Sequence, residues 1–247
     1  MKTVIKADSI IRDYSETIQV LKGIDFSANE GEFIGIMGRS GCGKTTLLKI
    51  LGLIDRPTQG TVYFQGRDTG ELDKDELSDI RRKELGFIFQ DFCLMDNLTV
   101  RENIYLPSIL DRDDISAIKE RTKSYAARTG LSHLLDKTPS ELSGGEKQRT
   151  AICRALMNSP AVILADEPTG SLDSQSGEAV MDMLEEINRN YGKTIILVTH
   201  DARVAAYCDK IITMRDGSIS DILQRGQGED RDSFCKRITL GLQESIR

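Results

Sequence analysis

The sequence predicts an α/β fold with a mostly parallel sheet, a small antiparallel β layer and an inserted helical lobe. Short apolar, β-rich runs alternate with helical segments through much of the 247-residue chain, as is typical of parallel strands joined by helices. A glycine-rich turn directly follows one of these runs, at 38–45. The stretch from about 91 to 141 is instead charged, helical in pattern and poor in strands.

The N-terminal thirty or so residues and the stretch Gly60–Gly66 have the pattern of short strands separated by turn residues, so we assign them to the antiparallel layer. Between them, Glu32–Met37 is an apolar run that we expect to be a buried strand. The segment Thr45–Leu51 is expected to be a helix. A strand, a glycine-rich turn and a helix in this order form the context that a phosphate-binding turn requires.

The turn itself matches the phosphate-binding pattern G-x-x-x-x-G-K-[ST]. Its glycines let successive backbone N–H groups curl around an anion, and the helix that follows directs its positive end at that anion. We expect Lys44 to contact the β- and γ-phosphates of ATP and Thr45 to offer its hydroxyl to Mg²⁺. The predicted phosphate-binding residues are Gly38, Arg39, Ser40, Gly41, Cys42, Gly43, Lys44, Thr45 and Thr46.

The inserted lobe is expected to consist of helices, with Pro107 and Pro139 marking breaks between them. After the lobe, the apolar runs Ala161–Ala165 and Thr194–Val198 predict two more buried strands. Between these runs, helical spacing predicts a helix that packs on the core through Val180, Met183, Leu184 and Ile187.

Polar residues follow both of these strands, at the end where parallel strands usually present functional groups. Asp166 and Glu167 come at the end of the first, and His200 follows the second. Asp166 suits a contact with Mg²⁺, and Glu167 suits polarisation of an attacking water. The acid pair therefore fits a phosphate-binding loop that serves hydrolysis.

Composition excludes some classes of function. Hydrophobic residues are 39% and charged residues 29% of the chain, which is ordinary for a globular protein. A formal net charge of −6 argues against a broad basic surface for nucleic acid or anionic lipid. No apolar run approaches the roughly 18–20 residues that span a bilayer, and the first residues lack the apolar segment of a signal peptide. We expect no nucleic acid, no direct membrane insertion and a cytoplasmic location.

One further motif decides the class of nucleotide-binding protein. The run Leu142-Ser143-Gly144-Gly145-Glu146-Lys147-Gln148-Arg149 lies between the phosphate loop and the acid pair. With these motifs in this order, nearly the whole chain resembles the ATP-binding-cassette (ABC) ATPases, whose signature sequence kinases and GTPases lack. The resemblance implies one ABC ATPase domain of the P-loop NTPase class over 1–247. Its parts are a RecA-like core with the antiparallel layer (1–90 and 160–225), a helical subdomain with the signature motif (91–159) and a C-terminal tail (226–247).

The resemblance also implies roles for single residues. Tyr14 is similar to the aromatic residue that stacks on adenine, although a tyrosine packed at a strand end is an alternative. Gln90 resembles the loop glutamine, His200 the switch histidine and Asp173 the D-loop acid. The expected catalytic residues are Glu167, His200 and Gln90. The expected Mg²⁺-binding residues are Thr45, Gln90 and Asp166.

Two chains act together in the resembled family. The signature segment of one subunit closes over the γ-phosphate that a second subunit holds, so Ser143, Gly144, Gly145 and Asp173 are expected to complete the ATP site of a homodimer. Hydrolysis then lets the closed dimer open. The resemblance implies that an integral-membrane permease receives this movement and keeps the ATPase at the inner face of the cell membrane. Five apolar residues either line the groove for that permease or belong to the lobe's core: Phe92, Leu94, Met95, Leu98 and Val100.

Two segments, Phe89–Phe92 and Leu98–Asn103, resemble the macrolide-export and lipoprotein-release branch of the family. The tail segment Gly226–Phe234 is similar to ATPases of bacitracin-type antimicrobial-peptide resistance, which is the function we expect. The alternatives are a lipoprotein-release or macrolide-export ATPase, or a non-transport ABC ATPase such as an iron–sulfur assembly factor. A nucleotide-gated module without hydrolysis is disfavoured by the acid pair. Helical spacing in the tail predicts a packed terminal helix with Phe234, Ile238 and Leu242 on one face.

Overall fold

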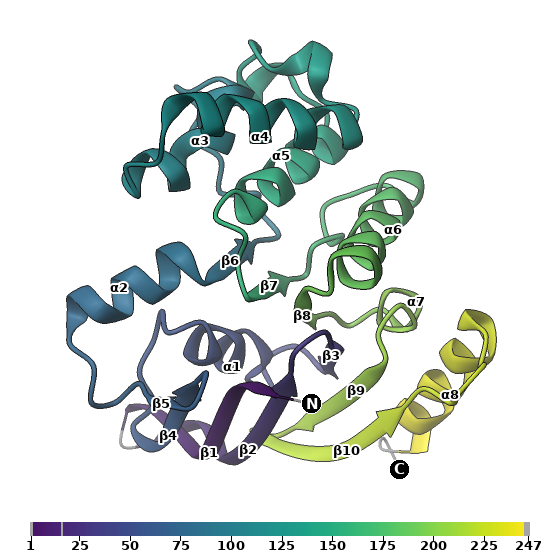
Figure 1. The fold of residues 1–247 in the computed structure, drawn as a ribbon. Coiled ribbons are helices and arrows are strands. Elements are labelled where there is room, and N and C mark those ends of the chain that lie inside the picture. The colour runs from purple at the N-terminus through teal and green to yellow at the C-terminus, as the bar shows by residue number, and fades with distance from the viewer. Residues whose placement is uncertain (1, 16, 245–247) are drawn as a thin grey trace.

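The computed structural model describes residues 2–15 and 17–244 and arranges them in two sheets and a helical lobe (Figure 1). The larger sheet is parallel except at β10, which is antiparallel to its neighbour. Its six strands lie in the order β10 (Ser218–Gln224), β9 (Lys210–Arg215), β3 (Phe33–Gly38), β8 (Thr194–Val198), β7 (Val162–Asp166) and β6 (Leu85–Ile88). The predicted fold class is confirmed.

The smaller sheet is antiparallel and lies in the order β2 (Ile18–Asn29), β1 (Thr3–Ser15), β4 (Gln59–Phe64) and β5 (Arg67–Asp68). The expectation of short N-terminal strands is wrong, because β1 and β2 are 13 and 12 residues long. The pairing of β1 with β2 shifts register on both sides of Ile10, and Ser9 has a φ of 52°. Such irregularities let a long strand bend without ending.

The core strands are buried on both faces. Along β3, Ile34 and Ile36 face a core that includes residues of the small sheet and of helix α1 (Lys44–Leu51). Phe33 and Met37 face the opposite side, where they pack in a core with residues of helix α6 (Ser174–Tyr191). Successive side chains of a strand point to opposite faces of the sheet, and both faces are covered here. The sequence of β3 is therefore an unbroken apolar run.

The remaining core helices are α2 (Lys74–Lys83), α7 (Ala202–Ala205) and α8 (Arg231–Glu244). The predicted tail helix is confirmed as α8, whose Phe234 and Ile238 are buried against α6 and α7. The predicted stripe of α6 is also buried, although Met183 is only partly covered. No helix within the described residues is long and apolar enough to cross a bilayer.

The lobe contains α3 (Val100–Leu110), α4 (Ile115–Arg128) and α5 (Gly144–Leu156), with short 3₁₀ turns η1 (Ser132–Leu134) and η2 (Pro139–Glu141). It has an apolar core of its own, which includes Val100. Pro107 was expected to break a helix but lies inside α3. The helix continues past it because later amides still find acceptors, as where the Asp111 N–H donates to the Pro107 carbonyl oxygen at 3.1 Å.

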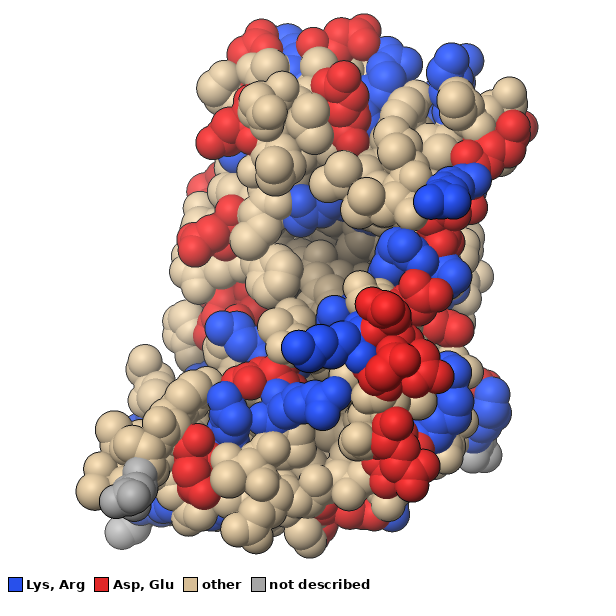
Figure 2. Space-filling model, turned by 90° about the vertical axis from the view of Figure 1, so that its left-hand side faces the viewer, with Lys and Arg blue, Asp and Glu red and all other residues tan. Residues whose placement is uncertain are grey.

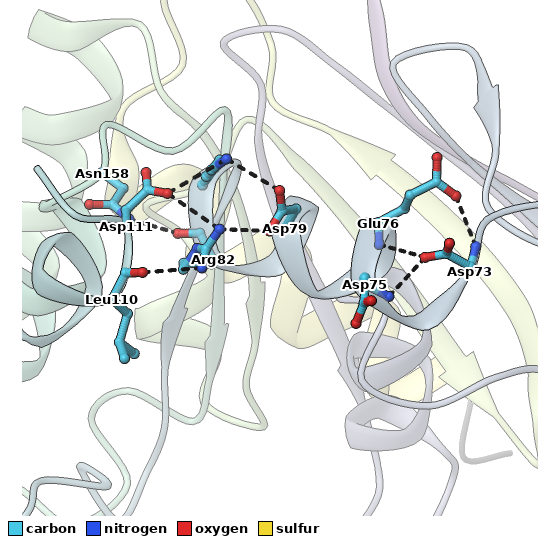
Figure 3. A network of polar contacts seen from close by, with 9 residues as sticks. Asp73, Asp75, Glu76, Asp79, Arg82, Leu110, Asp111 and Asn158 are labelled. Atoms are coloured by element: carbon cyan, nitrogen blue, oxygen red, sulfur yellow. Dashed lines mark hydrogen bonds and ion pairs between the residues drawn. The ribbon is translucent and has the colours of Figure 1, made fainter.

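Polar contacts join the lobe to the core at the end of α2 (Figure 3). The Arg82 guanidinium donates to the Leu110 carbonyl oxygen at 3.2 Å and pairs with Asp111 at 3.3 Å. The Asn158 amide donates to the Arg82 carbonyl oxygen at 3.0 Å. On this side the two parts meet through partly exposed polar groups, which exchange partners more easily than a close-packed apolar core does.

Asn103 holds the segment that leads into α3. It is fully buried, and its side-chain oxygen accepts the Met95 N–H at 2.8 Å. Its amide nitrogen donates to the carbonyl oxygens of Met95, Leu98 and Thr99 at 3.0–3.1 Å. The hydrogen bonds of this one side chain therefore hold the backbone of Met95–Thr99, which forms neither a helix nor a strand.

We predict that Asn103→Asp lowers the free energy of unfolding by about 2–4 kcal/mol, because a buried carboxylate would face three carbonyl oxygens. Urea denaturation measures this change. Asn97→Asp, at an exposed position of the same segment, is the control and is expected to stay within about 0.5 kcal/mol. Equal effects of the two substitutions would contradict the role of Asn103.

Candidate active site

The phosphate-binding turn runs from the end of β3 to the start of α1. Gly38 has a φ of 153°, and a Cβ added there would lie 2.3 Å from the Met214 carbonyl oxygen. Gly43 precedes α1 with a φ of 100°, and its added Cβ would lie 2.8 Å from the side chain of Leu21. Both positions require glycine, because residues of β9 and β2 pack so closely against the turn that a side chain would not fit. The strands around the turn therefore constrain its backbone.

Lys44 lies inside this turn and is buried. Its ammonium group donates to the carbonyl oxygens of Gly38 at 2.8 Å and Arg39 at 3.0 Å. Both acceptors are neutral, so they satisfy hydrogen bonds without cancelling the positive charge. A buried ammonium at the N-terminus of a helix attracts an anion such as a phosphate group.

Asp166 ends β7 beside the start of α1. The Thr45 hydroxyl donates to its carboxylate at 3.0 Å. Burial raises the pKa of Asp166, and the nearby Glu167 charge adds to this, whereas the Thr45 hydrogen bond and Lys44 act in the opposite direction. A hydroxyl and a carboxylate are hard oxygen ligands of the kind Mg²⁺ prefers. The residues present fit a magnesium ion at this place.

Glu167 follows directly but is oriented differently. Its backbone has a φ of 47°, in the left-handed region that non-glycine residues rarely adopt. Its carboxylate lies 2.9 Å from the Nδ1 atom of His200, which follows β8. The Glu167 side chain is 17% exposed and that of His200 is 72% exposed. Strained backbone that positions a carboxylate at a cavity wall is common in catalytic sites.

Lys44, Thr45, Glu167 and His200 line a cavity of about 690 Å³. Gln90, after β6, also lines it. The Ser171 hydroxyl donates to the Gln90 carbonyl oxygen at 3.0 Å and so ties Gln90 to the segment after β7. The predicted residues that line the cavity are Gly38, Arg39, Ser40, Gly41, Gly43, Lys44, Thr45, Thr46, Gln90, Glu167 and His200.

Two contributors were not anticipated from the sequence. Val20 of β2 lines the cavity, and Ser171 holds Gln90. Val20 lies in an ordinary strand pattern and carries no signal of its own. Ser171 belongs to the segment that contains Asp173, but nothing in the sequence indicates that its hydroxyl contacts Gln90.

Asp166, Tyr14 and Cys42 are predicted residues that do not line this cavity, although Asp166 contacts Thr45, which does. Tyr14 lies in a shallow hollow of its own, 56% exposed, with the Arg12 guanidinium 4.9 Å from its ring centre. An exposed ring with one face covered by a cation is available for stacking on its other face. Cys42 is buried and faces a neighbouring cavity of about 490 Å³ behind the turn, beside Met214 and Leu242.

The signature residues lie at the N-terminus of α5. Ser143 and Glu146 form a capping box, in which the Glu146 carboxylate accepts the Ser143 N–H at 2.7 Å. Gly144 packs against the side chain of Leu172, where an added Cβ would lie at 3.2 Å. Asp173 caps α6 by accepting the Ser176 N–H at 3.0 Å. Ser143, Gly144, Gly145 and Asp173 do not line the cavity at the phosphate-binding turn of their own chain.

Comparisons with known proteins identify the family. The sequence model of the family described as ABC transporter matches residues 21–170. The bacitracin export ATP-binding protein BceA of Halalkalibacterium halodurans is 42% identical over 238 residues, which are 95% of this chain and 94% of that protein. The macrolide export ATP-binding/permease protein MacB of Wolinella succinogenes is 46% identical over 228 residues, which are 92% of this chain but 35% of that protein.

A solved structure has the same fold. The cassette MJ0796 of Methanocaldococcus jannaschii, described as a dimer in a post-hydrolysis state bound to ADP and Pi, superposes with a TM-score of 0.84. It is 41% identical, and the match covers 90% of this chain and 100% of that one. The chain therefore belongs to the ABC transporter family, as one of its ATPase subunits.

Proposed function

We propose that two copies of this chain hydrolyse ATP between them and thereby drive an integral-membrane permease that confers resistance to bacitracin-type peptide antibiotics. One observation carries the dimer: the chain has both a phosphate-binding turn and a signature helix, but the signature residues lie away from the turn of the same chain. A helix N-terminus with two glycines is a ready site for phosphate. The dimeric state of the MJ0796 cassette supports this arrangement.

Each group at the turn has one task in this proposal. Lys44 leaves the carbonyl oxygens of Gly38 and Arg39 and binds the β- and γ-phosphates, for which it is a buried counter-charge. Thr45 and Asp166 hold Mg²⁺, which supplies charge neutralisation for phosphoryl transfer. Tyr14 stacks on the adenine, with Arg12 against the ring's other face.

Glu167 is the group that activates water. Its carboxylate faces the cavity, while His200 contacts it at 2.9 Å and fixes its orientation. Because a carboxylate at this place accepts a proton from water as the γ-phosphate is attacked, the pair provides general-base assistance. Gln90 adds a neutral amide to the same cavity, close to the Glu167 backbone, where it senses whether the cavity is filled.

The permease is proposed to bind between the lobe and the core. Figure 2 shows a hollow about halfway up the molecule. Its floor is largely uncharged, and charged groups surround its rim. Apolar side chains after Gln90 are available for a partner, since Phe92, Leu94 and Leu98 are only partly buried and Met95 is 49% exposed. Val100 is fully buried in the lobe core. The permease would keep the ATPase at the inner face of the cell membrane.

The peptide-antibiotic function rests on similarity to BceA along almost the full length of both chains. In the host, deleting this chain is predicted to raise sensitivity to bacitracin-type peptides, and the wild-type chain but not Lys44→Ala is predicted to restore resistance. Purification of the tagged chain from host membranes is expected to co-purify a permease. Unchanged sensitivity to such peptides but altered macrolide resistance would favour the macrolide-export alternative, and a soluble scaffold partner would favour iron–sulfur assembly.

For Glu167→Gln, we predict retained ATP binding with turnover lowered by about 10²–10⁴-fold, because the amide cannot accept the proton of water. The protein should then accumulate as an ATP-bound dimer, which gel filtration with light scattering detects. Glu120→Gln, at an exposed position of α4, is the control and should turn over normally. Undiminished hydrolysis by Glu167→Gln would remove this residue from the mechanism.

For Asp166→Asn, we predict opposite effects on activity and stability. Loss of the charged partner of Thr45 should lower Mg²⁺-dependent turnover by about 10–100-fold. Because burial raises the pKa of Asp166 in the folded protein, its ionised form costs stability at every pH above its ordinary pKa of about 4. Asparagine removes that cost.

The nucleotide-free Asp166→Asn variant should therefore have a higher Tm than wild type near pH 7, and the difference should shrink as the pH falls toward about 4. Differential scanning calorimetry at several pH values measures this. A lower Tm at neutral pH would mean that the ionised carboxylate stabilises the fold through Thr45.

A further inference from the structure

The segment after Gln90 makes an unusual turn. Phe92 and Cys93, which are consecutive and not glycine, have φ values of 60° and 48°. The Phe92 N–H donates to the Phe89 carbonyl oxygen at 3.1 Å, and the Cys93 N–H donates to that of Asp91 at 2.6 Å. Two adjacent side-chain-bearing residues in the left-handed region persist only where surrounding structure holds them.

Arg154 supplies that hold. It lies in the last turn of α5, and its guanidinium donates to the carbonyl oxygen of Phe92 at 2.8 Å and to that of Cys93. Burial lowers the pKa of Arg154. None of the ion pairs between described residues includes this guanidinium. A partly buried guanidinium is thus directed at the backbone of one turn.

The other end of the same helix touches the same turn. A Cβ added at Gly144 would lie 3.9 Å from the tip of the Phe92 ring. Both ends of α5 therefore contact this turn. The Phe92 ring lies near the signature residues at the helix N-terminus, and the carbonyl oxygens of Phe92 and Cys93 accept hydrogen bonds near its C-terminus. Gln90, two residues before Phe92, lines the nucleotide cavity.

We propose that Arg154 is a positioning residue that locks the Phe92–Cys93 turn onto α5, so that Gln90 and the signature end of α5 move as one body. This inference rests on the proposed function, in which Gln90 and the signature residues serve one reaction. The planar fork of arginine suits two successive carbonyl oxygens, whereas the single ammonium of lysine replaces it only in part.

The test compares Arg154→Met and Arg154→Lys with Arg121→Met. Arg121 lies on α4 in the same lobe and also donates to a backbone carbonyl oxygen, that of Met157 at 2.9 Å, and pairs with Asp113. It therefore controls for general destabilisation of the lobe. All variants are assayed for binding of a fluorescent ATP analogue and for steady-state ATP hydrolysis, and each is also made in the Glu167→Gln background for ATP-dependent dimerisation.

For Arg154→Met, we expect nucleotide affinity within about twofold of wild type, because the phosphate-binding turn is untouched, and kcat lowered by about 10–100-fold through misplacement of Gln90 and the signature residues. Dimerisation in the Glu167→Gln background should be lost. Arg154→Lys should recover part of both, and Arg121→Met should behave like wild type.

Hydrogen exchange over residues 89–95 is the second measurement and remains informative in Arg154→Lys if Arg154→Met does not fold. Exchange should be faster in the Arg154 variants than in Arg121→Met, since the turn loses its anchor. Unchanged exchange, or normal kcat and normal dimerisation in folded Arg154 variants, would overturn the inference. Failure of Glu167→Gln alone to dimerise with ATP would instead overturn the proposed function.

Discussion

Side-by-side pairing of four parallel strands is the constraint on which the site depends. In the order β3, β8, β7 and β6, neighbouring strands end in register, with Ile36 opposite Val198, Val198 opposite Asp166, and Ala165 opposite Ile88. All four run the same way, so the segments that follow them emerge at one edge. The phosphate-binding turn, His200, the acid pair and Gln90 therefore meet although they are far apart along the chain.

At this edge, the backbone gives two adjacent carboxylates different surroundings. Asp166 still belongs to β7, so its side chain is held beside α1 and the Thr45 hydroxyl. Glu167 turns into the left-handed region and meets His200. Asp166 is therefore placed to bind a cation, and Glu167 is placed to accept a proton. Both placements cost conformational or desolvation energy, which the buried apolar strands on either side offset.

The lobe meets the core of the molecule through both apolar and polar contacts, since Ile152 and Leu156 of α5 are buried in one cluster with residues of the large sheet and α6. Near α2 it is joined through Arg82, Asp111 and Asn158 (Figure 3). Near the nucleotide cavity it is joined through the turn after Gln90, which Arg154 of α5 contacts. The lobe also has an apolar core of its own, which stays intact if these polar contacts exchange partners.

The sequence by itself determined the class of fold and predicted most of the residues that line the candidate site. The pattern Gly38–Thr45, the acid pair at the end of an apolar run and the order of the motifs predicted an ABC ATPase, and the fold and family are confirmed. These features are local, since a glycine-rich turn or a strand end carries its chemistry within a few residues. Only the tertiary structure decided the long N-terminal strands, the place of Pro107 inside α3, and the contacts of Val20, Ser171 and Arg154. These depend on which segments lie beside one another, and a valine in a strand or an arginine on a helix looks the same in sequence whether it faces solvent or a nucleotide cavity.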